Sequence, residues 1–128
     1  MPAVHSSQIA KNDTSIVDGG MPGGFVIQIK NGPTFYHTGD TDLFGDMSLI
    51  PKIAKIDVML ACIGDHFTMG PARAAEAVKL IRPKTVIPMH FGTFPVLTGT
   101  VPDFDKALKK TGGGAKLREM KIGETIEL

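Results

Sequence analysis

The chain has 128 residues, about one domain's worth, and its 14 basic and 13 acidic residues leave a formal net charge of +1. No basic stripe suggests a nucleic-acid footprint, and no apolar run approaches the roughly 20 residues that span a bilayer. The first residues lack the basic-then-apolar pattern of a secretory signal, and the single cysteine, Cys62, excludes an intramolecular disulfide. We therefore expect one cytoplasmic domain, residues 1–128, without a nucleic-acid or membrane partner.

The first half of the chain has the pattern of short strands separated by turns. Residues 25–30 alternate apolar and polar side chains, as in a half-buried strand, and Asn31-Gly32 predicts a two-residue hairpin turn into the next strand. Residues 6–24 carry turn residues without apolar periodicity, so we expect a long loop there. A helix is expected at 46–55, with Pro51 either starting or breaking it. The strands expected in this half cover residues 1–4, 25–30 and 33–37.

The second half alternates between strands and helices. Residues 57–63 are apolar on both faces, so this strand must be covered on both faces. Pro71 predicts the first turn of a helix over 71–81, and Gly112-Gly113-Gly114 ends another helix at 102–110. The strands expected in this half cover residues 57–63, 84–89, 117–121 and 124–128. The alternation predicts a layered α/β fold with functional loops at the carboxyl ends of its strands.

Three of the expected strands end in a side chain that can bind a metal ion. His5 follows the first strand, Asp40 follows the strand 33–37 within a glycine-containing turn, and His90 follows the strand 84–89. Two imidazoles and a carboxylate are ligand types that Zn²⁺, Mn²⁺ or iron prefer in hydrolytic sites. Polar residues that only cap turns would give the same pattern, and the spacing leaves both interpretations open.

Three segments of the sequence carry a more specific signal. They are residues 37–47 (HTGDTDLFGDM), 63–71 (IGDHFTMGP) and 86–95 (VIPMHFGTFP). Together they resemble consecutive motifs of the metallo-β-lactamase superfamily. More narrowly, they resemble its branch of uncharacterised metal-dependent hydrolases related to ascorbate-phosphate lactonase. The similarity runs from about His5 to Leu128.

This resemblance implies a fold, a reaction and a cofactor. The superfamily has a four-layer αββα sandwich with one or two metal ions at the sheet edges. The chain would be half of such a sandwich, an α/β fold in which helices pack on one face of a β-sheet. The reaction would be hydrolysis of a small-molecule lactone, ester, amide or phosphodiester by metal-activated water. The cofactor would be Zn²⁺, or else Mn²⁺ or iron, with one or two ions per complete site.

The matching positions imply a role for each candidate residue. His5 would be a ligand of one metal ion, Asp40 the carboxylate that bridges both, and His90 a ligand of the other. Asp40 would also orient the attacking water. We include His66 as a catalytic candidate because loops at strand ends line the cleft of such sheets. His37 fits a structural contact better than a metal ligand.

One motif of the superfamily is missing from the chain. The metal-binding sequence His-x-His-x-Asp-His belongs to the N-terminal half of the fold, and the four histidines, at 5, 37, 66 and 90, do not form it. The chain thus resembles only the C-terminal half of such an enzyme, and we expect it to bind metal weakly and to hydrolyse slowly by itself. The expected partner is a complementary N-terminal half or further copies in a homo-oligomer.

Two other functions stay open. The chain could be a non-catalytic α/β binding or dimerisation module that retains the scaffold, with two copies covering each other's sheet faces. It could also be a regulatory or ligand-binding domain without catalysis. Stoichiometric metal uptake that is lost on His90→Ala would favour the hydrolase over both.

Overall fold

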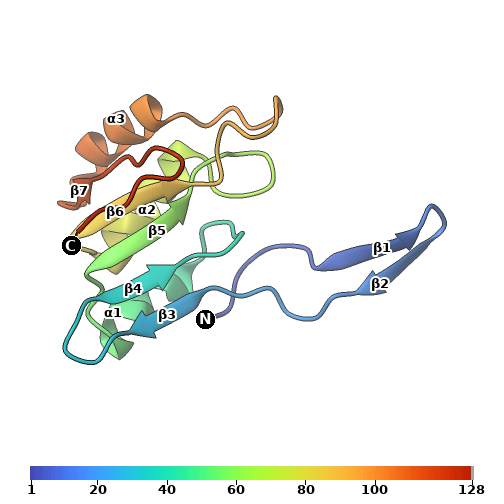
Figure 1. Cartoon of the computed structure of the whole chain (residues 1–128), viewed down its shortest axis with the longest axis horizontal. Helices are drawn as coiled ribbons and strands as arrows, with labels where there is room; N and C mark the ends of the chain where they lie inside the picture. The colour runs from blue at the N-terminus through green and yellow to red at the C-terminus, as the bar shows by residue number, and fades with distance from the viewer. Residues whose placement is uncertain (128) are drawn as a thin grey trace.

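A five-stranded β-sheet forms the centre of the molecule in the computed structural model, which describes residues 1–127 (Figure 1). Strand β3 is antiparallel to β4, whereas β4, β5, β6 and β7 run parallel, in the spatial order β3-β4-β5-β6-β7. The carboxyl ends of the parallel strands therefore meet at one edge of the sheet. The strands are β3 (Phe25–Gln28), β4 (Thr34–His37), β5 (Val58–Cys62), β6 (Thr85–Met89) and β7 (Lys116–Leu117).

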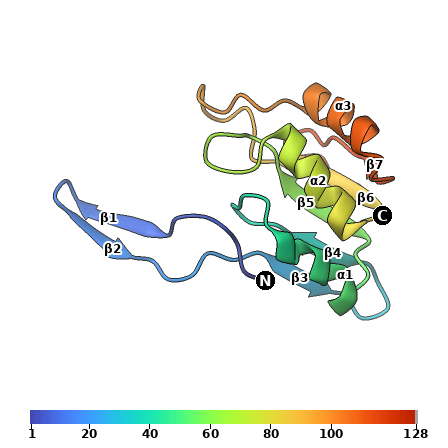
Figure 2. The ribbon, with the colours of Figure 1, turned by 180° about the vertical axis from the view of Figure 1, so that it is seen from behind.

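The helices lie together on one face of this sheet, with α3 packed against α2 (Figure 2). Their apolar sides share one core with Met59 of β5 and Val86 of β6, which are both fully buried. The helical segments are a 3₁₀ turn η1 (Gly45–Leu49), α1 (Ile50–Ile53), α2 (Pro71–Ile81) and α3 (Val101–Thr111). The expected arrangement, a mixed α/β sheet with helices on one face, is confirmed.

The two longer helices follow their capping residues. Helix α2 has the predicted bounds, with Pro71 in its first turn and Arg82 in the left-handed conformation (φ 54°) at its end. Helix α3 extends beyond the predicted 102–110 at both ends. Thr100 caps its N-terminus by accepting a hydrogen bond from the Asp103 N–H at 3.2 Å, and Gly112 (φ 70°) ends it.

The helix expected at 46–55 is wrong as a single element. The structure has a 3₁₀ turn there, followed by the short helix α1, and Pro51 lies in the first turn of α1. Proline lacks the N–H that would continue an α-helix from the preceding turn, but it fits the first turn of a new one.

The hairpin between β3 and β4 is confirmed, but its turn is longer than predicted. The register pairs Gln28 with Thr34, and the Ile29 N–H donates to the Pro33 carbonyl at 3.3 Å. The loop is therefore residues 30–32 rather than Asn31-Gly32 alone. Asn31 takes the left-handed conformation (φ 59°), which asparagine tolerates better than most residues.

The long loop expected at 6–24 is wrong in its middle. Strands β1 (Gln8–Asn12) and β2 (Ser15–Asp18) form an antiparallel hairpin that projects away from the main sheet (Figures 1 and 2). The Asn12 side chain organises its turn, because Asn12 Oδ1 accepts hydrogen bonds from the Thr14 N–H and from the Ser15 hydroxyl, at 3.0 and 2.7 Å. The hairpin is therefore held by a local side-chain turn, and its two strands lack the apolar alternation that would have predicted them.

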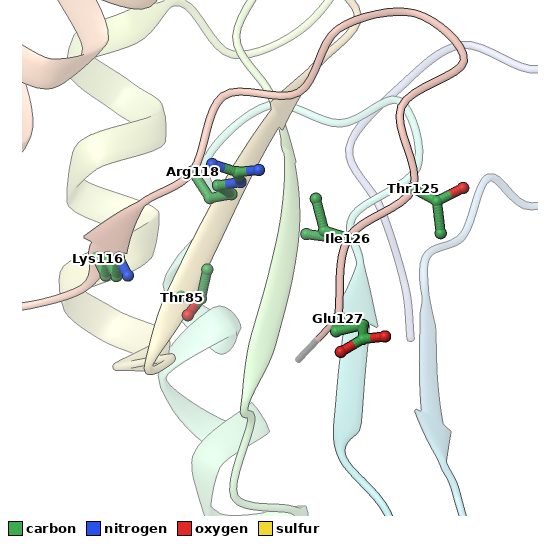
Figure 3. A pocket seen from close by; sticks show the side chains of 6 residues that line it. All are labelled: Thr85, Lys116, Arg118, Thr125, Ile126 and Glu127. Carbon is green, nitrogen blue, oxygen red and sulfur yellow. The ribbon is translucent and has the colours of Figure 1, made fainter.

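The ends of the chain form less sheet than expected. The strand predicted at 1–4 is reduced to a single bridge between Pro2 and Gly23. Of the strand predicted at 117–121, only Lys116–Leu117 pairs with β6, and residues 124–127 form no strand, while Leu128 lies outside the described residues. The segment after β7 instead turns back over the sheet, where Arg118 and Ile126 line a pocket (Figure 3). No helix within residues 1–127 is long and apolar enough to cross a membrane.

Candidate functional site

Three parallel strands deliver the candidate loops to the same edge of the sheet. In the register, Tyr36 of β4 pairs with Met59 of β5, and Met59 pairs with Val86 of β6. The loops that follow these strands therefore start side by side. They carry the residues that sequence analysis singled out, namely Asp40, His66 and His90.

Asp40 and His90 come together at this edge. The distance from His90 Nε2 to Asp40 Oδ2 is 3.5 Å, and the side chains are 25% and 50% exposed. Because the two residues are 50 positions apart in the sequence, only the parallel pairing of the strands that precede them explains the contact. A nitrogen and an oxygen donor thus face each other in a position open to solvent.

His5 lies on a neighbouring segment without joining this pair. The Val4 N–H donates to Thr41 Oγ1 at 2.9 Å, and the Asp42 N–H donates to the Val4 carbonyl at the same distance, so the segment runs beside the Asp40 loop. The His5 ring itself is close to the Ser6 carbonyl, with Nδ1 at 2.5 Å. Within residues 1–127, no three His, Cys, Asp or Glu side chains form a group that could hold a metal ion.

The donors present fit part of a metal site. A catalytic zinc ion takes three protein ligands, and the described residues bring two candidates together. His90 Nδ1 is also buried without a hydrogen-bond partner among residues 1–127. Native proteins satisfy nearly all buried polar atoms, so this nitrogen, which is not the one that faces Asp40, needs a partner that the described residues do not supply.

Backbone strain is concentrated at the same edge. Asp65, His66 and His90 have φ angles of 66°, 56° and 56°, in the left-handed region that non-glycine residues rarely adopt. Gly64 allows the two loops to approach, because a Cβ at this position would lie 2.1 Å from the His90 carbonyl oxygen. Such strain accumulates where the surrounding structure holds a functional loop in place.

The loop with His66 is exposed, and Arg73 connects it to the Asp40 loop by ion pairs. The His66 and Phe67 rings meet edge to face, with centroids 4.4 Å apart. Arg73 of α2 pairs with Asp42 at 2.5 Å and reaches Asp65 at 3.8 Å. Sequence reasoning missed Arg73, since nothing in its helical pattern signals a pairing with two loops.

His37 has a structural contact, as the sequence suggested. Its Nδ1 accepts a hydrogen bond from the Gly39 N–H at 3.1 Å, which supports the left-handed turn at Gly39 (φ 64°) just before Asp40. The ring thus stabilises the loop that carries the carboxylate.

The pocket in Figure 3 is separate from this site. One of its lining residues, Thr85, is the first residue of β6, whereas His90 follows the last residue of that strand.

Asp57, near the same end of the sheet as Thr85, pairs with Lys84 at 2.6 Å. Hydrogen bonds from the Lys84 ammonium and the Thr34 N–H lower the pKa of the Asp57 carboxyl group below its ordinary value.

Comparison with known proteins shows the family of the chain. A family model described as the beta-lactamase superfamily domain matches residues 4–90. A UPF0173 metal-dependent hydrolase of Thermodesulfovibrio yellowstonii is 57% identical over 130 residues, which cover 100% of this chain and 49% of that protein. Another, from Archaeoglobus fulgidus, is 43% identical and covers 99% of this chain and 54% of that protein.

A solved structure shares the same architecture. Igni18, a novel metallo hydrolase from the hyperthermophilic archaeon Ignicoccus hospitalis, superposes with a TM-score of 0.81 and 40% sequence identity. The superposition covers 98% of this chain and 49% of Igni18. The chain therefore spans about half the length of the curated relatives and of this structure.

Proposed function

Because the chain belongs to the beta-lactamase superfamily, we propose that it forms part of a metal-dependent hydrolase. The contact between Asp40 and His90, 3.5 Å apart at the ends of two parallel strands, carries this proposal. Relatives named metal-dependent hydrolases match almost the whole chain, which supports a metal cofactor.

We assign the metal ligands from the residues at this edge. Asp40 and His90 hold a divalent ion, for which Zn²⁺ is the first choice and Mn²⁺ or iron the alternatives, and His5 is the third candidate ligand. A complete site holds one or two ions. The remaining ligands come from a complementary N-terminal half or from another copy of the chain.

The chain's residues would bind and orient the reactants around the metal. A bound metal ion supplies hydroxide at neutral pH, because it lowers the pKa of its water to about 7, and it polarises the bond under attack. Asp40 accepts a hydrogen bond from the attacking water and fixes its direction. His66, exposed on the adjacent loop, contacts a small lactone, ester, amide or phosphodiester substrate.

The first test is the metal content of the purified chain, measured by elemental analysis without affinity-tag metal or chelator. Because the described residues supply only part of the ligand set, we expect weak uptake, which is lost on His90→Ala because one of these ligands is removed. His66→Ala is the matched control and should retain the metal, since His66 is exposed and outside the pair. Metal uptake by the wild type that His90→Ala leaves unchanged would refute the assignment.

A second candidate function is favoured by the sheet face opposite the helices. Phe25, Ile27 and Ile29 are 65%, 50% and 51% exposed there. A non-catalytic module that dimerises through this face would bury these side chains without using a metal. Indifference of the dimer to His90→Ala would support this alternative.

A further inference from the structure

Strand β3 forms an open edge of the main sheet. Among residues 1–127 it pairs only with β4, and Figure 1 shows it as the outermost strand on its side. Natural proteins protect edge strands by shortness, charges, proline or bulges, because unpaired backbone groups there recruit another strand. The opposite edge strand, β7, has only two residues, whereas β3 has four uncharged residues in an unbroken register and no proline. The β3 edge thus lacks this protection.

The hydrogen bonds on either side of β3 show which of its backbone groups point outwards. Just before the strand, the Met1 amino group donates to the Gly24 carbonyl at 2.7 Å, and the Gly24 N–H donates to the Met1 carbonyl at 2.9 Å. Just after the strand, the Ile29 N–H donates inwards, at 3.3 Å, to the chain that returns as β4. Because this direction alternates along an antiparallel strand, Val26 and Gln28 direct their N–H and carbonyl groups to the open side.

These outward groups match those of a second copy in one register. If two β3 strands lie antiparallel with Ile27 opposite Ile27, then Val26 of each copy faces Gln28 of the other, and each outward N–H meets an outward carbonyl. The same register places Phe25 of each copy opposite Ile29 of the other.

The side chains match in this register as well. Phe25, Ile27 and Ile29 are 65%, 50% and 51% exposed, on the sheet face that the helices leave open. Aromatic and β-branched side chains that face each other across paired strands stabilise the pairing. Each of these side chains therefore gains an apolar partner from the same set, and such self-complementarity is what an interface with two-fold symmetry requires.

We propose that two copies of the chain associate through their β3 edges, so that their two five-stranded sheets become one continuous sheet. A strand pair of this length buries less than the roughly 800 Å² per partner of a standard interface, so the dimer is weak and forms at micromolar concentration or above. The inference does not depend on the proposed metal site, because none of the candidate ligands lies on β3.

Charged residues at position 27 test the register. Sedimentation velocity over a series from micromolar to millimolar concentration should show a monomer–dimer equilibrium for the wild type. Ile27→Lys and Ile27→Glu should each weaken the dimer by about tenfold or more, because like charges then face each other at the symmetry axis. An equimolar mixture of the two variants should restore it, since lysine then faces glutamate. Circular dichroism should show that both variants fold, as Ile27 is half exposed.

A second pair of variants tests the backbone bonds. Gln28→Pro removes one outward N–H from each copy and leaves the bonds from β3 to β4, because this N–H does not point to β4. It should weaken the dimer, whereas Gln28→Ala keeps the N–H and should not. In the wild type, the Val26 and Gln28 amides should exchange more slowly as the concentration rises, while the Ile27 amide, which points to β4, should be protected at every concentration.

Three results would overturn the proposal. The first is a wild type that remains monomeric at the highest concentration. The second is a dimer that Ile27→Lys alone leaves unchanged, and the third is a mixture of the two charged variants that does not associate although the wild type does. None of these outcomes depends on metal uptake, so this proposal and the proposed function can fail separately.

Discussion

Tyr36 of β4 lies in the core that the sheet shares with the helices. Its side chain is fully buried, and its hydroxyl has no hydrogen-bond partner among residues 1–127. Burial, together with the nearby Cys62 thiol, raises the pKa of Tyr36 to about 12. A buried hydroxyl without a partner costs about 1 to 3 kcal/mol, so this residue is a local weakness of the core.

We expect Tyr36→Phe to raise the free energy of unfolding by about 1 kcal/mol at neutral pH, because the ring still packs and the unpaired hydroxyl is gone. Urea denaturation measures this difference. The control is Phe104→Tyr, which adds a buried hydroxyl on α3 and should destabilise the protein. A less stable Tyr36→Phe variant would mean that the hydroxyl has a partner.

Alkaline pH should separate the wild type from the same variant. The unfolded chain releases the tyrosine proton near pH 10, whereas the folded protein retains it up to about pH 12. The wild type therefore loses about 2 to 3 kcal/mol of stability as the pH rises through this window, and Tyr36→Phe lacks this loss. Tyr36 is the only tyrosine in a chain without tryptophan, so ultraviolet absorbance follows its titration directly.

The positions of individual site residues could be predicted only where the end of a strand determines them. Asp40 and His90 could be paired in advance because parallel neighbouring strands place their carboxyl ends together. The hydrogen bond from the Val4 N–H to the Thr41 hydroxyl could not be predicted, because the two residues are 37 positions apart and such a bond leaves no periodic pattern. His5 also shows this limit, since being next to a strand end did not bring its ring to the pair.

At the scale of elements, Asp57 connects the amino-terminal ends of three strands. Its Oδ2 accepts a hydrogen bond from the Thr34 N–H of β4, and Oδ1 pairs with Lys84 just before β6. Its carbonyl accepts a hydrogen bond from the Thr85 N–H at 2.9 Å. The charge on this carboxylate thus stabilises the ends of the sheet opposite the candidate site.

Asp57→Asn should destabilise the protein modestly at pH 7, by less than about 1 kcal/mol, because Lys84 is largely exposed and water screens the pair. The pKa of Asp57 is lowered in the folded protein, so its carboxylate contributes to stability at pH values above the unfolded-state pKa, near 4. This contribution to stability is lost as the pH falls through the folded-state pKa. Urea denaturation at pH 7 and pH 3 should show this acid loss in the wild type and less of it in the variant.

A matched variant tests whether this effect belongs to the sheet. Asp105→Asn removes another carboxylate–lysine pair, between Asp105 and Lys109 on the surface of α3. Because such helical pairs contribute only about 0.2 to 0.5 kcal/mol, this variant should be nearly neutral. Equal effects of both substitutions would mean that Asp57 does not join the strands.

Elements with local end signals were predictable, and those that depend on distant partners were not. Pro71 and the turn at Arg82 define α2 from the sequence, and the buried strands β5 and β6 follow from their apolar runs. The β1–β2 hairpin was missed because its turn relies on the Asn12 side chain rather than on an apolar pattern. The segment after β7 looked like strand by composition but found few pairing partners on the sheet.

The whole molecule is one-sided. The helices bury one sheet face, whereas the other face is crossed only in part by the segment after β7 (Figures 1 and 2). Phe25, Ile27 and Ile29 remain exposed on the strand β3 and its turn, and Ile9 and Ile16 are exposed on the β1–β2 hairpin. Large exposed apolar patches mark interaction sites, ligand-binding grooves or aggregation-prone surfaces.

This open face could bind another copy of the chain, which would then self-associate. If another copy of the chain covers this face, sedimentation at micromolar concentration should show self-association of the wild type. Ile27→Lys should then shift the chain to monomer. This variant should not lower the unfolding midpoint, because Ile27 is half exposed in the monomer. Ile53→Lys is the control, since Ile53 is 65% exposed on α1, on the helical side. A monomeric wild type would reject the homo-oligomer.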